Sequence, residues 1–212
     1  MTELDPTPKA NVKAKLAQVK IDAVMAATNA LLASKGYEAM TMDEVALQAG
    51  LSKASLYNLF TSKELLAGEA MIQVLNLGLE QVDALRKMTD KPAIEKLRRV
   101  TAWAMRTKID GKMPSLPAQN SNLSEALKAN EAYMTRLFDL SMKLGVWVGE
   151  AQEFGHISAR YPAEFVLYNL YARACDPVLE AMKSEGKYKN EQIVDFILEL
   201  HFAGLREAPS SD

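Results

Sequence analysis

The sequence has few of the residues on which most catalytic and metal sites depend. It contains one cysteine and two histidines, His156 and His201, which lie far apart. The single thiol, Cys175, cannot form a disulfide within the chain and gives no support to a zinc site. Neither histidine belongs to an H-x-x-H or H-E-x-x-H pattern, and no glycine-rich phosphate loop occurs. We therefore expect a protein that is not an enzyme, holds no metal and needs no cofactor.

Long apolar runs and strand-like alternation are missing as well. No apolar run approaches the ~18 residues that a membrane helix needs, and no signal-peptide pattern opens the chain. Apolar residues instead recur at helical spacing, and at 49% of the chain they suffice for a sizeable core. The sequence therefore predicts an all-α protein in the cytoplasm, without a membrane partner.

Positive charge is scarce overall but unevenly distributed. The net charge is −2, made up of +1 over residues 1–63 and −3 over residues 64–212. Lys9, Lys13, Lys15 and Lys20 lie in a stretch without acidic residues, which is either a basic arm for nucleic acid or a solvated tail. Residues 1–10, which contain two prolines, are predicted to be a disordered arm.

Residues 41–60, TMDEVALQAGLSKASLYNLF, predict two short helices joined by a tight turn. Thr41 and Glu44 have the spacing of a capping box. Gly50 can adopt positive φ at the turn, and Ser52 can cap the second helix. This arrangement is typical of a helix-turn-helix, whose second helix enters the major groove of DNA.

The region from Val24 to Leu66 resembles the N-terminal domain of TetR-type (TetR/AcrR) transcriptional repressors, which are bacterial ligand-responsive regulators. The resemblance lies in the joint spacing of Ala27, Leu31-Leu32, Gly36-Tyr37, Thr41-Met42, Val45-Ala46, Ala49 to Lys53, Leu56-Tyr57, Phe60 and Ser62 to Leu66. It departs from the family at Ala54-Ser55, where Gly-Thr is more frequent, and at Asn58-Leu59. Both departures lie on the recognition helix and therefore bear on which operator is read.

The predicted DNA-binding residues are Thr41, Met42, Ser52, Lys53, Ala54, Ser55, Tyr57, Asn58 and Lys63. Asn58 can pair with adenine, and Lys53 with guanine or a phosphate. For Tyr57 and Lys63, phosphate contact is what the resemblance implies. The alternatives are that Tyr57 packs between helices and that Lys63 is merely solvated.

We expect residues 11–63 to form the three-helix DNA-binding domain and residues 64–212 a helical effector-binding and dimerisation domain. The first helix spans about 11–35, with Leu16, Val19 and Leu31 on one side. A capping box at Thr61 and Glu64 starts the next helix. Later helices span about 92–110, from 126 or 131 to 154, from 162 with a kink or stop at Asp176-Pro177, and 190–205, with a loop over 111–122.

Trp103, Phe138, Met142, Tyr168 and Tyr171 are candidate ligand-binding residues, because apolar effector sites in this family lie in such a helical domain. Ordinary core packing is the alternative for each. Excess apolar positions on the last two helices favour a homodimer.

The sequence thus predicts a homodimeric, ligand-responsive regulator that binds double-stranded operator DNA, a repressor released by a small, mostly apolar effector. A TetR-like DNA-binding protein without an effector, with a structural or cell-division role, is the alternative.

Overall fold

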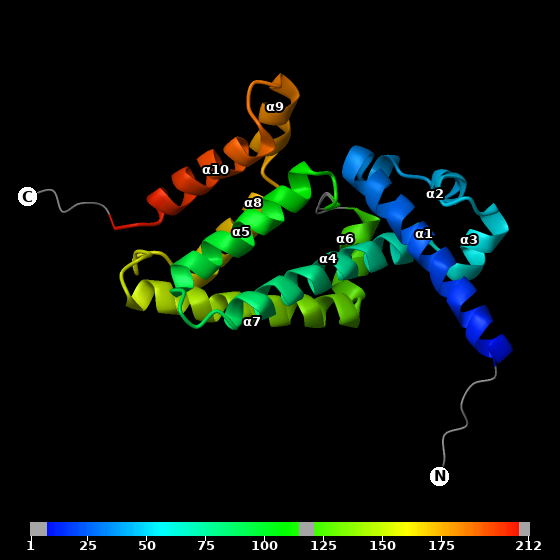
Figure 1. The fold of residues 1–212 in the computed structure, drawn as a ribbon, viewed down its shortest axis with the longest axis horizontal. Helices are drawn as coiled ribbons and strands as arrows, with labels where there is room; N and C mark the ends of the chain where they lie inside the picture. The colour runs from blue at the N-terminus through cyan, green and yellow to red at the C-terminus, as the bar shows by residue number, and fades with distance from the viewer. Residues whose placement is uncertain (1–7, 115–120, 208–212) are drawn as a thin grey trace, which may run out of the picture.

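The computed structural model describes residues 8–114 and 121–207, and in these ranges the protein contains ten α-helices and no strand (Figure 1). The helices are α1 (Pro8–Ala39), α2 (Met42–Gln48), α3 (Lys53–Leu59), α4 (Lys63–Arg86), α5 (Ala93–Ile109), α6 (Asn122–Ala129), α7 (Glu131–Glu153), α8 (Ala163–Ala174), α9 (Pro177–Glu185) and α10 (Asn190–Gly204). The all-α prediction is confirmed.

Helix α1 is longer than predicted at its first end. It already includes residues 8–10 of the predicted disordered arm, whereas residues 1–7 lie outside the described part of the chain. Its first turns extend away from the other helices, so Leu16 and Val19, which share one apolar side of the helix, are exposed (Figure 1). At its other end the φ of Gly36 is 77°, which interrupts the helical geometry where the sequence predicts the helix to end.

A stretch of this helix, Ala14–Ala39, is long and apolar enough to cross a membrane by length and composition alone. The prediction that no stretch reaches this length is therefore wrong. The second half of the same stretch packs in a protein core through Val24, Met25 and Leu32. Such packing is what a core helix of a globular domain shows.

Helix α4 connects the two ends of the molecule (Figure 1). Its N-cap is Ser62, whose hydroxyl accepts from the Leu65 N–H at 3.1 Å. The predicted capping box began at Thr61, so the cap lies one residue later. Leu66, Ala67, Ala70 and Met71, near the start of α4, are buried with α1–α3, whereas Val82 and Leu85 are buried with α5, α7, α8 and α10.

Two breaks organise the remaining helices. Asn130 separates α6 from α7, a break that the sequence reading left unresolved, and its side chain accepts from the Tyr133 N–H at 3.0 Å. At Asp176-Pro177 one helix has ended and the next begins. The Asp176 carboxylate accepts from the Val178 N–H at 3.0 Å and thereby caps α9. Helix α6 packs in the same core as α1–α3 through Leu123 and Leu127. A segment of the C-terminal part thus supports the DNA-binding end.

Candidate nucleic-acid interface and effector cavity

The turn between α2 and α3 is fixed by side-chain caps. Thr41 Oγ1 accepts from the Glu44 N–H at 3.3 Å, and Glu44 Oε2 accepts from the Thr41 N–H at 3.0 Å. Gly50 has a φ of 69°, and Ser52 Oγ accepts from the Ser55 N–H at 3.2 Å. Val45, Ala46 and Leu56 are buried where the two helices meet. These local contacts set the angle at which α3 is presented.

Most of the predicted DNA-binding side chains lie on the open surface of this unit. The side chains of Thr41, Ser52, Lys53, Ala54, Tyr57 and Asn58 are exposed, and Ser55 and Lys63 are half-buried. Met42 is different: it is only 7% exposed and packs in the core, so its side chain cannot reach a duplex. At most its backbone N–H, in the first turn of α2, is available to a phosphate.

Lys53 and Lys63, the two lysines among the predicted DNA-binding residues, already have partners within the protein. Lys53 Nζ lies 2.8 Å from an oxygen of Asp43, and this carboxylate raises the pKa of Lys53. Lys63 Nζ donates to the carbonyl of Glu38 at 3.2 Å and lies 4.3 Å from the centre of the Tyr37 ring. In the free protein both ammonium groups therefore contact groups of the protein itself. DNA phosphates would have to replace these partners.

A partly buried hydrogen bond ties α1 to α4 behind this surface. The Tyr37 hydroxyl donates to Glu64 Oε1 at 2.7 Å. Burial, followed by this bond, raises the pKa of Tyr37, and the bond lowers the pKa of Glu64. The phenol is thus neutral and the carboxylate charged at neutral pH, and the pair holds the start of α4 against the DNA-binding unit.

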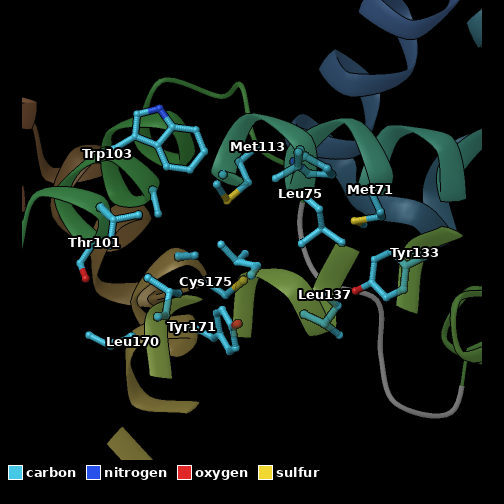
Figure 2. A pocket seen from close by; sticks show the side chains of 18 residues that line it. Met71, Leu75, Thr101, Trp103, Met113, Tyr133, Leu137, Leu170, Tyr171 and Cys175 are labelled. Atoms are coloured by element: carbon cyan, nitrogen blue, oxygen red, sulfur yellow. The ribbon is translucent and has the colours of Figure 1, made fainter. Parts of the chain in front are cut away.

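A cavity of about 290 Å³ lies between α4, α5, α7 and α8 (Figure 2). Met71, Val74, Leu75 and Gly78 line it from α4. The other walls include Trp103 on α5, Met113 after α5, Tyr133 and Leu137 on α7, and Tyr171 and Cys175 at α8 and its end. The lining is almost entirely apolar, as in pockets that bind small organic ligands.

Only two of the five candidate ligand-binding residues, Trp103 and Tyr171, line this cavity. Phe138, Met142 and Tyr168 are 64%, 56% and 69% exposed and lie outside it. One wall of the cavity is formed by three leucines of α7 that were not among the predicted ligand-binding residues: Leu137, Leu140 and Leu144. Their spacing of three and four residues marks one helix face, but the sequence does not say which of two apolar faces points inward.

The polar side-chain groups of the residues that line the cavity are hydroxyls, one thiol and the indole N–H of Trp103. The Tyr171 hydroxyl lies 2.8 Å from Ser141 Oγ, and Ser141 Oγ donates to the Leu137 carbonyl at 2.7 Å. Burial raises the pKa of Tyr171 and of Tyr133, so both phenols are neutral at neutral pH. Within the described residues, no cluster of three or more His, Cys, Asp or Glu side chains could hold a metal ion.

Comparison with known proteins gives one family match and many structural matches. Residues 24–70 match the model for bacterial regulatory proteins of the tetR family. No curated protein matches the sequence. Among solved structures, FadR from Bacillus subtilis in complex with stearoyl-CoA has a TM-score of 0.64 and 18% identity, covering 90% of this chain and 100% of that one.

Two further structures match equally far along the chain. AibR in complex with isovaleryl coenzyme A and operator DNA has a TM-score of 0.65 and 19% identity, covering 86% of this chain and 98% of that one. The ketosteroid transcriptional regulator KstR2 of Mycobacterium tuberculosis has a TM-score of 0.61 and 15% identity, covering 89% and 95%. At these identities the likeness concerns the fold.

Proposed function

Since this chain belongs to the tetR family of bacterial regulatory proteins, we propose that it is a ligand-responsive transcriptional repressor that leaves its operator when a small, mostly apolar effector fills the cavity. The observation that carries this proposal is the double role of α4. Met71 is 5% exposed in the core of the DNA-binding end and also lines the cavity. A ligand that moves Met71 therefore acts directly on the packing that positions α1–α3.

Helix α4 transmits such a movement over a short path. Three turns separate its N-cap at Ser62 from the cavity residues Met71, Val74 and Leu75, and the intervening Leu66, Ala67 and Ala70 are fully buried. Because close-packed helices move as units, a tilt of α4 carries the recognition helix with it. In a dimer, a shift of a few ångströms breaks the match to half-sites spaced by about 34 to 36 Å.

Several structural relatives support both halves of the proposal. AibR is solved with operator DNA and isovaleryl coenzyme A together, and FadR from Bacillus subtilis with stearoyl-CoA. Both proteins are thus regulators that bind an acyl-coenzyme A, and AibR binds operator DNA as well. The cavity in the C-terminal part favours this proposal over the alternative of a DNA-binding protein without an effector, because such a protein needs no ligand site.

We assign the DNA contacts to the exposed face of α3. We propose that Ser52, Lys53 and Ala54 at the start of α3 and Asn58 near its end face base edges, and that Thr41, Tyr57 and Lys63 contact phosphates. The exposure of most of these side chains supports the assignment. These contacts are sequence-dependent for Asn58 and largely independent of sequence for Lys63.

The proposed assembly is a cytoplasmic homodimer. Phe165 and Tyr168 on α8, and Phe196 and Leu200 on α10, are large apolar side chains that are 44% to 78% exposed in the single chain. Such a concentration on the last helices favours burial against a second copy, with a total interface upwards of about 2,000 Å².

Binding of genomic DNA fragments at several salt concentrations tests the function. The wild-type protein should retain specific fragments, and retention should fall steeply as salt rises. Lys63→Ala should flatten that dependence by about one unit of slope, whereas Asn58→Ala should relax preference at one base pair by about 1–3 kcal/mol. Absence of salt-sensitive retention by the wild-type protein would contradict the proposal.

A further inference from the structure

Among the residues that the structure describes, none of those lining the cavity carries a charged side chain. Its eighteen residues are apolar apart from the hydroxyls of Thr101, Tyr133 and Tyr171, the thiol of Cys175 and the indole N–H of Trp103. A charged ligand group inside such a cavity would lose its hydration without gaining an ionic partner, which is strongly unfavourable. The cavity therefore selects against carboxylates and phosphates on physical grounds.

The cations of α7 do not compensate for this lack. Helix α7 carries two, Arg136 and Lys143, and both are engaged elsewhere. Arg136 Nε donates to Asn76 Oδ1 at 2.6 Å, and Lys143 Nζ donates to the two carboxylate oxygens of Asp83 at 2.7 and 2.8 Å. Lys108, one turn beyond the lining residue Ala104, is buried but does not line the cavity.

The hydroxyl groups differ in what they can offer a ligand. Ser141 has one hydroxyl proton, which it donates to the Leu137 carbonyl at 2.7 Å, because a carbonyl can only accept. In the Ser141–Tyr171 pair, at 2.8 Å, Tyr171 is therefore the donor. Its oxygen keeps only lone pairs for a ligand. Thr101 likewise donates its proton to the Leu97 carbonyl at 2.8 Å.

Tyr133 complements Tyr171 from the start of α7. Within the described residues the Tyr133 hydroxyl forms no hydrogen bond, although it lies close enough to the Cys175 thiol to interact with it electrostatically, and Figure 2 shows its oxygen directed toward the side of the cavity where Leu137 and Tyr171 lie. It can both donate and accept. Tyr133 can thus donate a proton to a ligand oxygen, and the Tyr171 oxygen can accept a proton from a ligand hydroxyl.

We propose that the effector is an uncharged, largely hydrocarbon molecule with one hydrogen-bonding oxygen, and that Tyr133 and Tyr171 bind this oxygen. The inference rests on the proposed function and specifies its ligand. A volume of about 290 Å³ is filled by ~10 water-sized groups. Primary alcohols of medium chain length have this size and chemistry, and they serve as probes for the class.

The test compares three probes with the same chain, 1-octanol, octanoate and octanoyl-CoA, by calorimetric titration of the full-length protein at pH 7.5. Octanol should bind at least about tenfold more tightly than octanoate, because only octanoate must bury a charge. Octanoyl-CoA should not bind more tightly than octanol. Equal or tighter binding of octanoate or octanoyl-CoA overturns the inference, and so does a lack of octanol binding.

Matched variants locate the oxygen. Tyr133→Phe and Tyr171→Phe should each weaken octanol binding by about 3- to 10-fold, which is the range for one neutral hydrogen bond. Tyr168→Phe is the control, because Tyr168 lies on the same helix as Tyr171 and outside the cavity. Unchanged affinity in both cavity variants overturns the assignment of the two phenols. Lys108→Met should leave the preference for octanol intact.

Retention of DNA fragments, measured on the same preparations, separates this inference from the proposed function. If octanoate or octanoyl-CoA binds best and also releases DNA, the regulatory function stands and the inference about an uncharged ligand fails. If octanol binds with the expected preference but never weakens DNA retention, the cavity chemistry stands and the regulatory function fails.

Discussion

The two halves of α4 have different surroundings, and the difference explains how one helix can serve two purposes. Around its first half, Leu66, Ala67 and Ala70 are fully buried among α1, α2 and α6. Around its second half, Leu75 and Gly78 border a cavity. The first arrangement keeps the DNA-binding surface rigid, and the second leaves room that a ligand can fill. A ligand in the cavity can therefore shift the DNA-binding unit formed by α1–α3 without deforming it.

Leu56→Ala should have the largest effect on this comparison. Leu56 is fully buried between α2 and α3, and truncation should cost about 2–5 kcal/mol of folding free energy, because the filled core cannot collapse around the void. DNA binding should be lost, while octanol binding in the C-terminal cavity should persist. Thermal unfolding, DNA retention and calorimetry measure the three quantities, and Leu137→Ala in the cavity wall serves as control. Loss of octanol binding in Leu56→Ala would show that the two halves do not fold separately.

The contrast between the DNA-binding unit and the cavity also explains which features could be predicted from the sequence. The helix-turn-helix follows from contacts within a few residues, such as those of Thr41 with Glu44 and of Ser52 with Ser55, and these caps are where the spacing predicts them. The cavity wall follows from the rotation of α7 against its neighbours. Phe138 and Met142 have the composition of a ligand site, but Leu140 and Leu144 face inward. Composition did not distinguish the two faces, because both are apolar.

The ends of helices likewise show that local features can be predicted from the sequence, whereas features that depend on the packing of several helices cannot. The restart at Asp176-Pro177 was one of two alternatives that the sequence allowed, because proline and a capping carboxylate act locally. The exposure of Leu16 and Val19 was not predictable from their spacing. It depends on α1 extending past the helices that could cover it, which is a property of the whole arrangement.

Acid should destabilise the two halves over different pH ranges. His201 on α10 has a pKa lowered to about 4 by burial and by Arg173, so the folded state disfavours its charged form. Since the unfolded histidine binds a proton at about pH 6.5, stability should fall as pH drops from about 6.5 to about 4, by about 2 kcal/mol after allowance for partial exposure. His201→Leu should remove this slope, as measured by urea unfolding at several pH values. A slope that is unchanged in the variant would contradict the assignment.

In the DNA-binding half the sensitive group is Glu44, whose pKa is lowered to about 2 by its bonds to Lys35 and Thr41. A lowered carboxyl pKa contributes stability above its unfolded value of about 4.5, and this contribution is lost as pH falls toward about 2. The capping box should therefore remain intact in the range where His201 already acts. Glu44→Gln removes the charged cap. It should therefore lower the free energy of unfolding at pH values where Glu44 is charged, and leave it unchanged near pH 2.

Asp43→Asn should strengthen DNA binding several-fold. The Asp43 carboxylate neutralises Lys53 at 2.8 Å on the recognition helix, and its removal frees the cation for a phosphate. The slope of log affinity against log salt should steepen by about 0.9, because one more counterion is released. Asp90→Asn is the control, because Asp90 forms a similarly exposed pair with Lys91, at 3.3 Å, in the turn after α4. Weaker binding by Asp43→Asn would indicate that the carboxylate positions Lys53 productively.

The smallest effects should come from two glycines of α4, which compare its two halves directly. A Cβ on Gly68 would lie 3.9 Å from Leu127 Cδ2, and one on Gly78 would lie 3.6 Å from Leu140 Cδ2 and 3.8 Å from the Trp103 ring, which are ordinary contact distances. Each glycine-to-alanine change should therefore stabilise the helix by about 0.5–1 kcal/mol. Only Gly78→Ala adds a methyl group to the cavity wall, so only this variant should weaken octanol binding, by about twofold to fivefold. Thermal unfolding and calorimetry on the pair decide the matter: equal stabilisation with unequal ligand affinity supports the separation of the two halves, and a similar loss of affinity in Gly68→Ala would mean that the packing against α6 also shapes the cavity.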